Sequence, residues 1–156
     1  MGIKIHHPKY TAFVDGSSRG NPGSAGIGVA IFTEGRSEPV AEISRNIGTT
    51  TNNVAEYEAL ITALRWLVDQ KAENAVIKID SELVYKQLHG EYRIKTKHIL
   101  PLVDRAHNLL NLLPGAAIVL VPREENKCAD RLAQKASKIK KSPKTAKIKF
   151  IQEKIS

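Results

Sequence analysis

Four acidic residues occupy positions that suit chemistry on a phosphate ester. Asp15 and Asp80 each follow a run of β-forming residues, Glu56 shares the apolar side of a helical segment with core residues, and Asp130 lies in the first turn of a final helical pattern. If the two strands are parallel neighbours, both aspartates emerge at the same carboxyl edge of the sheet. Converging carboxylates stay ionised only when cations screen them. Ligand sets made of oxygen atoms suit Mg²⁺ or Mn²⁺, and two such ions about 4 Å apart can promote hydrolysis of a phosphodiester.

Each acid also has a purely structural explanation. An aspartate at the end of a strand is often a turn residue. Glu56 is three residues after Asn53, which is the spacing of a capping box. Asp130 shares a helix face with Asn126, and an acid in the first turn of a helix interacts favourably with the helix dipole. Spacing alone leaves these alternatives open.

The hydrophobic pattern predicts the elements that would position the four acids. Three strands joined by short turns, at residues 10–15, 26–33 and a third ending near Ile47, indicate an antiparallel meander. Apolar residues at helical spacing predict a helix over 52–69. A strand at 75–80, a helix opening at 81–88, a helix at 99–112, a strand at 117–121 and a helix at about 126–138 complete the pattern. The order βββαβααβα implies one mixed sheet flanked by helices.

The bulk composition favours a single domain with a cationic end. A chain of 156 residues is long enough for one hydrophobic core, and we expect a domain over 1–137 followed by a basic tail over 138–156. Residues 135–156 carry eight lysines and one glutamate, or +7 of the net +8. The tail is either a solvated arm that attracts a polyanion, or it contributes a short packed strand at 147–151.

The remaining bulk features point to a protein inside the cell. No run approaches the ~20 apolar residues of a membrane span, and the start lacks the apolar stretch of a secretory signal. Cys128 is alone, so an internal disulfide and a cysteine zinc site are excluded. We expect a cytoplasmic protein with no membrane partner.

Four ordered motifs resemble the signature blocks of the ribonuclease H type 1 family. They are FVDGSSRGNPGSAGIGVAI, TTTNNVAEYEAL, IDSELVYKQL and VPREENKCADRLAQKA, and together they cover residues 11 to about 137. The resemblance implies an α/β fold with a five-stranded mixed sheet in the order 3-2-1-4-5. It also implies a hydrolase that cuts the RNA strand of RNA–DNA hybrids with two Mg²⁺ or Mn²⁺ ions and leaves 5′-phosphate and 3′-hydroxyl ends. The implied catalytic and metal-binding acids are Asp15, Glu56, Asp80 and Asp130.

The same resemblance implies a set of nucleic-acid contacts. Gly20, Asn21 and Asn52 match positions that contact RNA 2′-hydroxyl groups, which distinguish RNA from DNA. Thr51 and Asn53 match positions near the DNA strand. Asn126, on the face of Asp130, completes the expected set. Gly-Asn-Pro-Gly is also a common turn sequence, and TTTNN is a common helix entry.

Two departures from the family pattern and two rival functions stand beside this interpretation. The loop before Asp130 has no histidine, and Arg123 or Glu124 is the candidate substitute. The long basic protrusion of some relatives is reduced to Arg93, Lys95, Lys97 and His98.

The rival functions are a non-catalytic module that binds hybrid or double-stranded RNA, and the nuclease region of a reverse transcriptase. The starting Met and the early first strand favour a free-standing protein over a reverse transcriptase region. We expect a monomer that acts on hybrids, with double-stranded RNA as a second candidate substrate.

Overall fold

The computed structural model describes residues 8–139 of the chain. Five strands and four α-helices follow one another in the predicted order βββαβααβα. The strands are β1 (Tyr10–Ser18), β2 (Gly23–Thr33), β3 (Ala41–Thr50), β4 (Val76–Ile79) and β5 (Ala117–Leu120). The α-helices are α1 (Asn52–Asp69), α2 (Glu82–Leu88), α3 (Leu100–Leu110) and α4 (Lys127–Ser137), with single 3₁₀ turns at Lys97–Ile99 and Arg123–Glu125.

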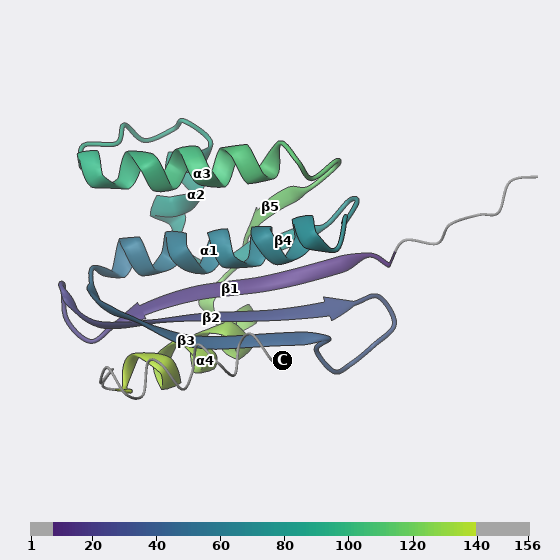
Figure 1. Cartoon of the computed structure of the whole chain (residues 1–156), viewed down its shortest axis with the longest axis horizontal. Helices are drawn as coiled ribbons and strands as arrows, with labels where there is room; N and C mark the ends of the chain where they lie inside the picture. Colours follow the sequence, from purple (N-terminus) through teal and green to yellow (C-terminus); the bar gives the residue numbers. More distant parts are fainter. Residues whose placement is uncertain (1–7, 140–156) are drawn as a thin grey trace, which may run out of the picture.

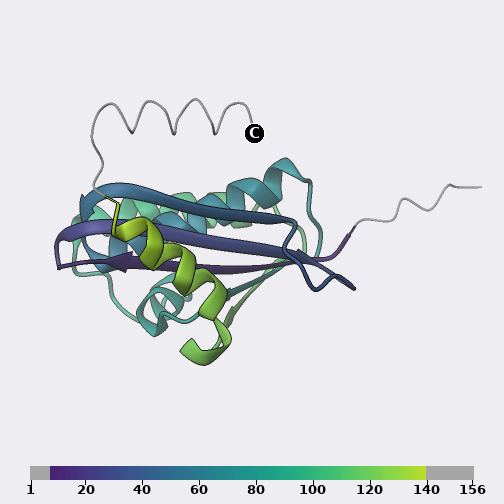
Figure 2. The same cartoon turned by 90° about the horizontal axis from the view of Figure 1, so that it is seen from below.

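The strands form one mixed sheet in the order β3-β2-β1-β4-β5, which confirms the predicted fold class. The first three strands are antiparallel neighbours, whereas β4 runs parallel to both β1 and β5. Helices cover both faces of this sheet. Figures 1 and 2 show α1 and α3 on one face and α4 crossing the other.

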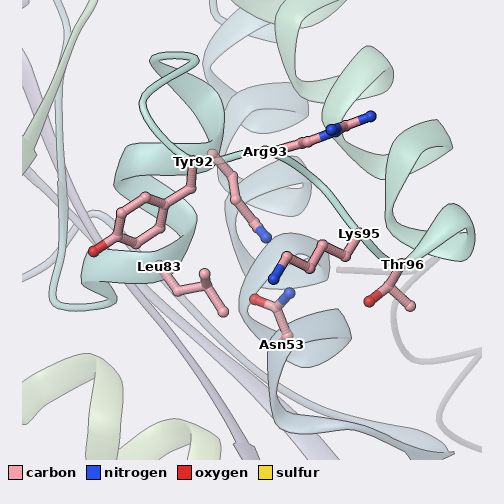
Figure 3. A pocket seen from close by; sticks show the side chains of 7 residues that line it. Asn53, Leu83, Tyr92, Arg93, Lys95 and Thr96 are labelled. Atoms are coloured by element: carbon pink, nitrogen blue, oxygen red, sulfur yellow. The ribbon is translucent and has the colours of Figure 1, made fainter.

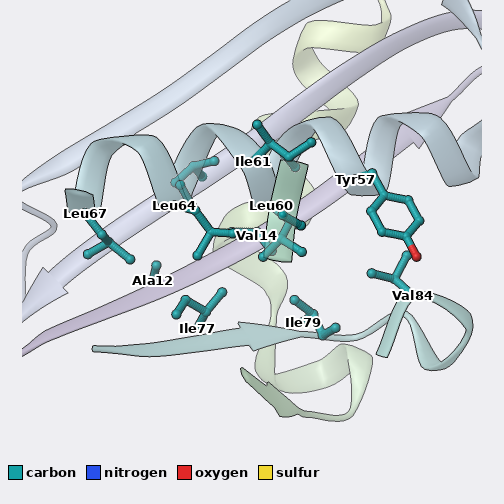
Figure 4. Close-up of a cluster of buried hydrophobic side chains, with 14 of the residues drawn as sticks. Ala12, Val14, Tyr57, Leu60, Ile61, Leu64, Leu67, Ile77, Ile79 and Val84 are labelled. Atoms are coloured by element: carbon teal, nitrogen blue, oxygen red, sulfur yellow. The ribbon is translucent and has the colours of Figure 1, made fainter. Parts of the chain in front are cut away.

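The core lies between α1 and the centre of the sheet. Leu60, Leu64 and Leu67 repeat along one side of α1 and are fully buried. They point toward strand residues such as Val14 and Ile77 (Figure 4). Full burial of such a side chain contributes about 1.5–3 kcal/mol to folding, so this interface fixes α1 rigidly over β1.

Two local predictions are wrong. Asp15 does not close a strand, because β1 continues to Ser18 through its antiparallel pairing with β2. The parallel partner β4 is shorter, and Asp80 follows its last residue directly. At the start of α1, the N-cap is Thr51 and not Asn53: the Thr51 hydroxyl accepts a hydrogen bond from the Val54 amide. The capping box proposed for Asn53 and Glu56 is therefore absent.

Helix α4 is held against β2 and β3 at both of its ends. Near its start, a Cβ built on Gly28 of β2 would overlap the carbonyl oxygen of Ala129, so only glycine allows this approach. At its end, the buried Asn46 side chain donates hydrogen bonds to the carbonyl oxygens of Ala136 and Ile139. The tail proposed for 138–156, including the strand suggested at 147–151, lies outside the described residues from position 140 onward. Over residues 8–139, no helix is both long enough and apolar enough to cross a bilayer.

Candidate active site

Three of the four predicted acids meet at one point beside the sheet. Asp15, Glu56 and Asp80 each offer a carboxylate oxygen, and these oxygens all lie within 4.8 Å of one another. Asp15 and Glu56 are almost completely buried, and Asp80 is half-buried. The carboxylates come from β1, α1 and the end of β4, so three separate elements converge here.

Sheet register and a glycine bring these three acids together. Phe13 of β1 pairs with Lys78 of β4, and two further residues along each strand place Asp15 beside Asp80. Gly16 faces α1 so closely that an added Cβ would overlap the Ala55 carbonyl carbon and the Glu56 nitrogen. The missing side chain at Gly16 therefore lets α1 approach β1 at the turn that carries Glu56.

Asp130 joins the cluster from the opposite face of the sheet. Its position follows from Gly28, which is the β2 partner of Asp15 and the point where α4 touches the sheet at Ala129. Asp130 lies within hydrogen-bonding reach of Asp15, and its two oxygens accept hydrogen bonds of 3.1 and 3.0 Å from Gln134 Nε2. The acids open into a cavity of about 170 Å³ that is lined by Asp15, Gly16, Ser17, Asn52, Glu56, Arg123, Asp130 and Gln134.

Burial and mutual repulsion disfavour ionised carboxylates in this cluster. Burial is the largest cause that raises the pKa of Asp15, and the negative charges of Glu56 and Asp80 raise it further. Burial also raises the pKa of Glu56, with a further contribution from Asp80, while the hydrogen bond with Asp15, the Gly16 amide and the Arg123 guanidinium act in the opposite direction. A divalent cation would remove this penalty, because it favours the ionised form of every carboxylate around it. The oxygen-only donor set thus fits a hard ion such as Mg²⁺ or Mn²⁺.

The residues predicted to contact nucleic acid gather beside this cavity, with one exception. The Asn21 side chain accepts a hydrogen bond of 3.2 Å from the Asn52 amide, which ties the turn between β1 and β2 to the start of α1. Gly20 is exposed in the same turn. A second cavity of about 240 Å³ opens next to them and is lined by Asn21, Thr51, Asn53, Thr96, His98 and Ile99.

Asn126 is the exception, because its side chain is fully buried. Its Nδ2 donates hydrogen bonds of 2.8 Å to the Val14 carbonyl oxygen and to Asp80 Oδ2. The structure therefore gives Asn126 no exposed surface for nucleic acid, and it places the residue behind the acid cluster as a support for Asp80.

Comparisons with known proteins give the family. The family described as "Reverse transcriptase-like" matches residues 13–136. Ribonuclease HI of Halobacterium salinarum is 41% identical over 135 residues, which are 86% of this chain and 65% of that protein. Its solved structure has a TM-score of 0.77 at 40% identity, covering 82% of this chain and 96% of that chain. The chain belongs to the ribonuclease H type 1 family.

Two further solved structures of this family are similar to the chain. The N-terminal ribonuclease H domain of Rv2228c from Mycobacterium tuberculosis has a TM-score of 0.77 at 41% identity, covering 83% of this chain and 98% of that one. LC11-RNase H1, isolated from compost and solved with an RNA/DNA hybrid, has a TM-score of 0.74 at 38% identity, covering 82% and 96%. The chain spans only 34% of full-length Rv2228c, which is called a bifunctional protein.

The structure also locates the two departures from the family pattern. Arg123, in the 3₁₀ turn before α4, lines the acid cavity, whereas Glu124 is exposed and does not line it. The short basic segment at 91–98 borders a cavity of about 410 Å³ that is lined by Asn53, Leu83, Gln87, Tyr92, Arg93, Lys95 and Thr96. Figure 3 shows the Lys95 side chain pointing toward Asn53. The reduced protrusion of this ribonuclease H domain thus still places cations near the start of α1.

Sequence reasoning missed two residues of the site. Gly16 acts through close tertiary approach by admitting α1, whereas Gln134 acts within α4 by donating hydrogen bonds to Asp130. The only signal for Gln134 in the sequence is its spacing of four residues from Asp130, which places both on one helix face.

Proposed function

We propose that this chain is a metal-dependent endoribonuclease that hydrolyses the RNA strand of RNA–DNA hybrids. The observation that carries the proposal is the convergence of three carboxylates from β1, α1 and β4, with Asp130 beside them, in a chain of the ribonuclease H type 1 family. Buried acids of this kind are costly to the fold unless cations compensate them, so their presence favours function over structure. LC11-RNase H1, which binds such a hybrid, supports the substrate class.

The four acids are the residues that would hold the metal. By family likeness, Asp15 would be a ligand common to two ions, Glu56 and Asp80 would help to hold one of them, and Asp130 would help to hold the other. Bound Mg²⁺ or Mn²⁺ supplies a water of lowered pKa and positive charge for the phosphate oxygens. The protein's part is to fix the carboxylates: Asn126 orients Asp80, and Gln134 orients Asp130. The expected products carry 5′-phosphate and 3′-hydroxyl ends.

Selection of the RNA strand is assigned to the turn between β1 and β2 and to the start of α1. Gly20, Asn21 and Asn52 adjoin the acid cavity, where 2′-hydroxyl groups of the RNA strand would lie. Thr51 and Asn53, which line the neighbouring cavity, are assigned to the DNA strand. Double-stranded RNA is the second candidate substrate, and a monomeric, cytoplasmic enzyme remains the prediction.

One incubation series tests the proposal. Labelled RNA–DNA hybrid, double-stranded RNA, single-stranded RNA and duplex DNA are each incubated with Mg²⁺, Mn²⁺ or EDTA. Internal cuts in the RNA of the hybrid that require metal, together with intact duplex DNA, are expected. Cutting by Asp15→Asn protein, or cutting in EDTA, would show the assignment of the acids to be wrong. Binding of hybrid without any cutting would favour the rival function, a non-catalytic binding module.

A further inference from the structure

Four cationic side chains form a line along the outer face of α4. Lys127, Arg131, Lys135 and Lys138, the last at the C-cap of the helix, follow one another at intervals of four, four and three residues. Residues at these intervals share one face of a helix, and all four are exposed. We call these four residues the α4 stripe. The opposite side of the helix is buried against the sheet.

The cations of the α4 stripe have no ion-pair partner in the part of the chain that the structure describes. The nearby acid of α4, Asp130, accepts hydrogen bonds from the neutral Gln134 amide and forms no ion pair with the stripe. Glu42 of β3 is near enough to influence the Cys128 thiol, but it forms no ion pair with Arg131. A surface of this kind attracts a polyanion over a distance of about one Debye length.

Both ends of the stripe are fixed next to the proposed hybrid site. The stripe begins directly after Asn126, which is hydrogen-bonded to Asp80 of the acid cluster. It ends where Ser24 Oγ donates a hydrogen bond of 2.7 Å to the Ser137 carbonyl oxygen. The Ser24 carbonyl oxygen in turn accepts a hydrogen bond from the Arg19 amide, at the mouth of the turn that contains Gly20 and Asn21. The stripe therefore runs along a helix that is anchored at both ends, beside the cluster at its start and near that turn at its end.

We infer that the α4 stripe binds backbone phosphates of the duplex beside the point of cleavage. The inference rests on the proposed function, because it takes the acid cluster as the place of the scissile phosphate. Helix α4 is about 16 Å long, which spans several phosphates of one strand. It crosses the sheet face opposite α1 and α3, so a duplex at the cluster would meet cations on two sides: residues 91–98 on one and the stripe on the other (Figure 2).

A pair of charge-matched variants tests the stripe. In an Asp15→Asn background, which prevents cutting, Lys127, Arg131, Lys135 and Lys138 are changed to Gln. The control carries Arg36→Gln, Arg65→Gln, Lys71→Gln and Arg105→Gln, four exposed cations that line none of the cavities described above. Both variants lose the same net charge. Hybrid affinity is then measured in Mg²⁺ over a series of salt concentrations.

The slope of log affinity against log salt distinguishes the outcomes. Each lost phosphate contact lowers the magnitude of this slope by roughly 0.9 on B-form duplex. The slope is expected to fall by about two or more in the stripe variant and by less than about one in the control. Equal slopes for the two variants would overturn the inference and leave the stripe as a solvated helix face. If the stripe variant fails to fold by circular dichroism, single Lys135→Gln and Lys71→Gln proteins give the same comparison with a smaller difference. Failure of the wild-type chain to cut hybrid would overturn the proposed function separately, since the stripe is judged by binding alone.

Discussion

Asn126 donates a hydrogen bond of 2.8 Å from its Nδ2 to Oδ2 of Asp80, and so connects the start of α4 to the end of β4. The same amide nitrogen also donates to the Val14 carbonyl oxygen of β1. A single buried side chain thereby links three of the elements that supply the acid cluster. Its own Oδ1 is buried without a hydrogen-bond partner among the described residues, so the two donated bonds determine its orientation.

Replacement of Asn126 by Ala is expected to damage both stability and activity. The buried Val14 carbonyl oxygen and the half-buried Asp80 carboxylate would lose their donor, at a cost of about 1–3 kcal/mol for a buried group left unsatisfied. Asp80 would also lose its orienting partner, so cleavage should fall even below the melting temperature. Chemical denaturation and initial cleavage rates measure the two effects, with the exposed Asn111→Ala as the matched control. Wild-type behaviour of Asn126→Ala would contradict a supporting role.

The metal-free protein is expected to lose stability as pH rises. Burial raises the pKa of Asp15 and of Glu56, so the folded state binds their protons more tightly than the unfolded chain does. Their favourable contribution is complete below the unfolded pKa of about 4, and it is lost as pH rises through the raised folded values. In EDTA, Asp15→Asn should therefore become increasingly more stable than the wild type between pH 5 and pH 8.

Added metal should reverse this order. Mg²⁺ or Mn²⁺ binds only the folded wild type with full affinity, so it raises the melting temperature by mass action. Asp15→Asn lacks one ligand and should respond less. Thermal melts of both proteins at several pH values, with EDTA or with millimolar metal, measure the difference. If the melting temperatures of the two proteins change in parallel with pH and with metal, Asp15 is neither repelled by neighbouring carboxylates nor a ligand of the metal.

Local patterns were sufficient to predict the order of the elements, and they marked the four acids as candidates whose convergence spacing alone left open. The apolar repeat of α1 predicted the helix over 52–69 and the inward position of Glu56, because helical periodicity alone determines which side chains share a face. The strand order that places the segments before Asp15 and Asp80 side by side was implied by the family resemblance, and the two strands are parallel neighbours. Strand length was less predictable, since the antiparallel pairing with β2 extends β1 past Asp15 and no local signal marks that extension.

Contacts between residues far apart in the chain could not be predicted from the sequence. Asn126 was expected to contact nucleic acid on the face of Asp130, yet its side chain is buried and donates hydrogen bonds to β1 and to Asp80. Thr51 and Asn53 are both good N-cap residues, and local sequence preference does not decide that Thr51 is the cap. Such choices depend on tertiary approach, which spacing does not encode.

Arg123, and not Glu124, is expected to compensate for the absent loop histidine. Arg123 lines the acid cavity and its charge favours the ionised form of Glu56, whereas Glu124 is exposed outside the cavity. Arg123→Ala should lower turnover at saturating hybrid by about tenfold, which corresponds to about 1.4 kcal/mol of barrier. Arg123→Lys, which keeps the positive charge, should recover part of this loss, and Glu124→Ala should match the wild type. A larger loss in Glu124→Ala would reverse the assignment.

Removal of residues 140–156 is expected to separate two roles of the basic tail. The cut leaves Ile139, whose carbonyl oxygen is held by Asn46 close to the turn at 19–23, so the domain keeps its last anchor. Lysines at 140–149 would extend the positive charge of the α4 stripe along the duplex. Their loss should weaken hybrid binding and lower the slope of log affinity against log salt by roughly 0.9 for each phosphate contact removed.

The alternating segment at 147–151 contains Ile148, Phe150 and Ile151. Its packing would add a few kcal/mol to the free energy of unfolding, about 1.5–3 for each side chain fully buried. Lys→Gln substitution at 140, 141 and 144 removes charge but keeps that apolar segment. This variant should lose salt dependence without losing melting temperature, whereas the truncation should lose both, and a truncation that matches the wild type in both measurements would show the two roles to be wrong.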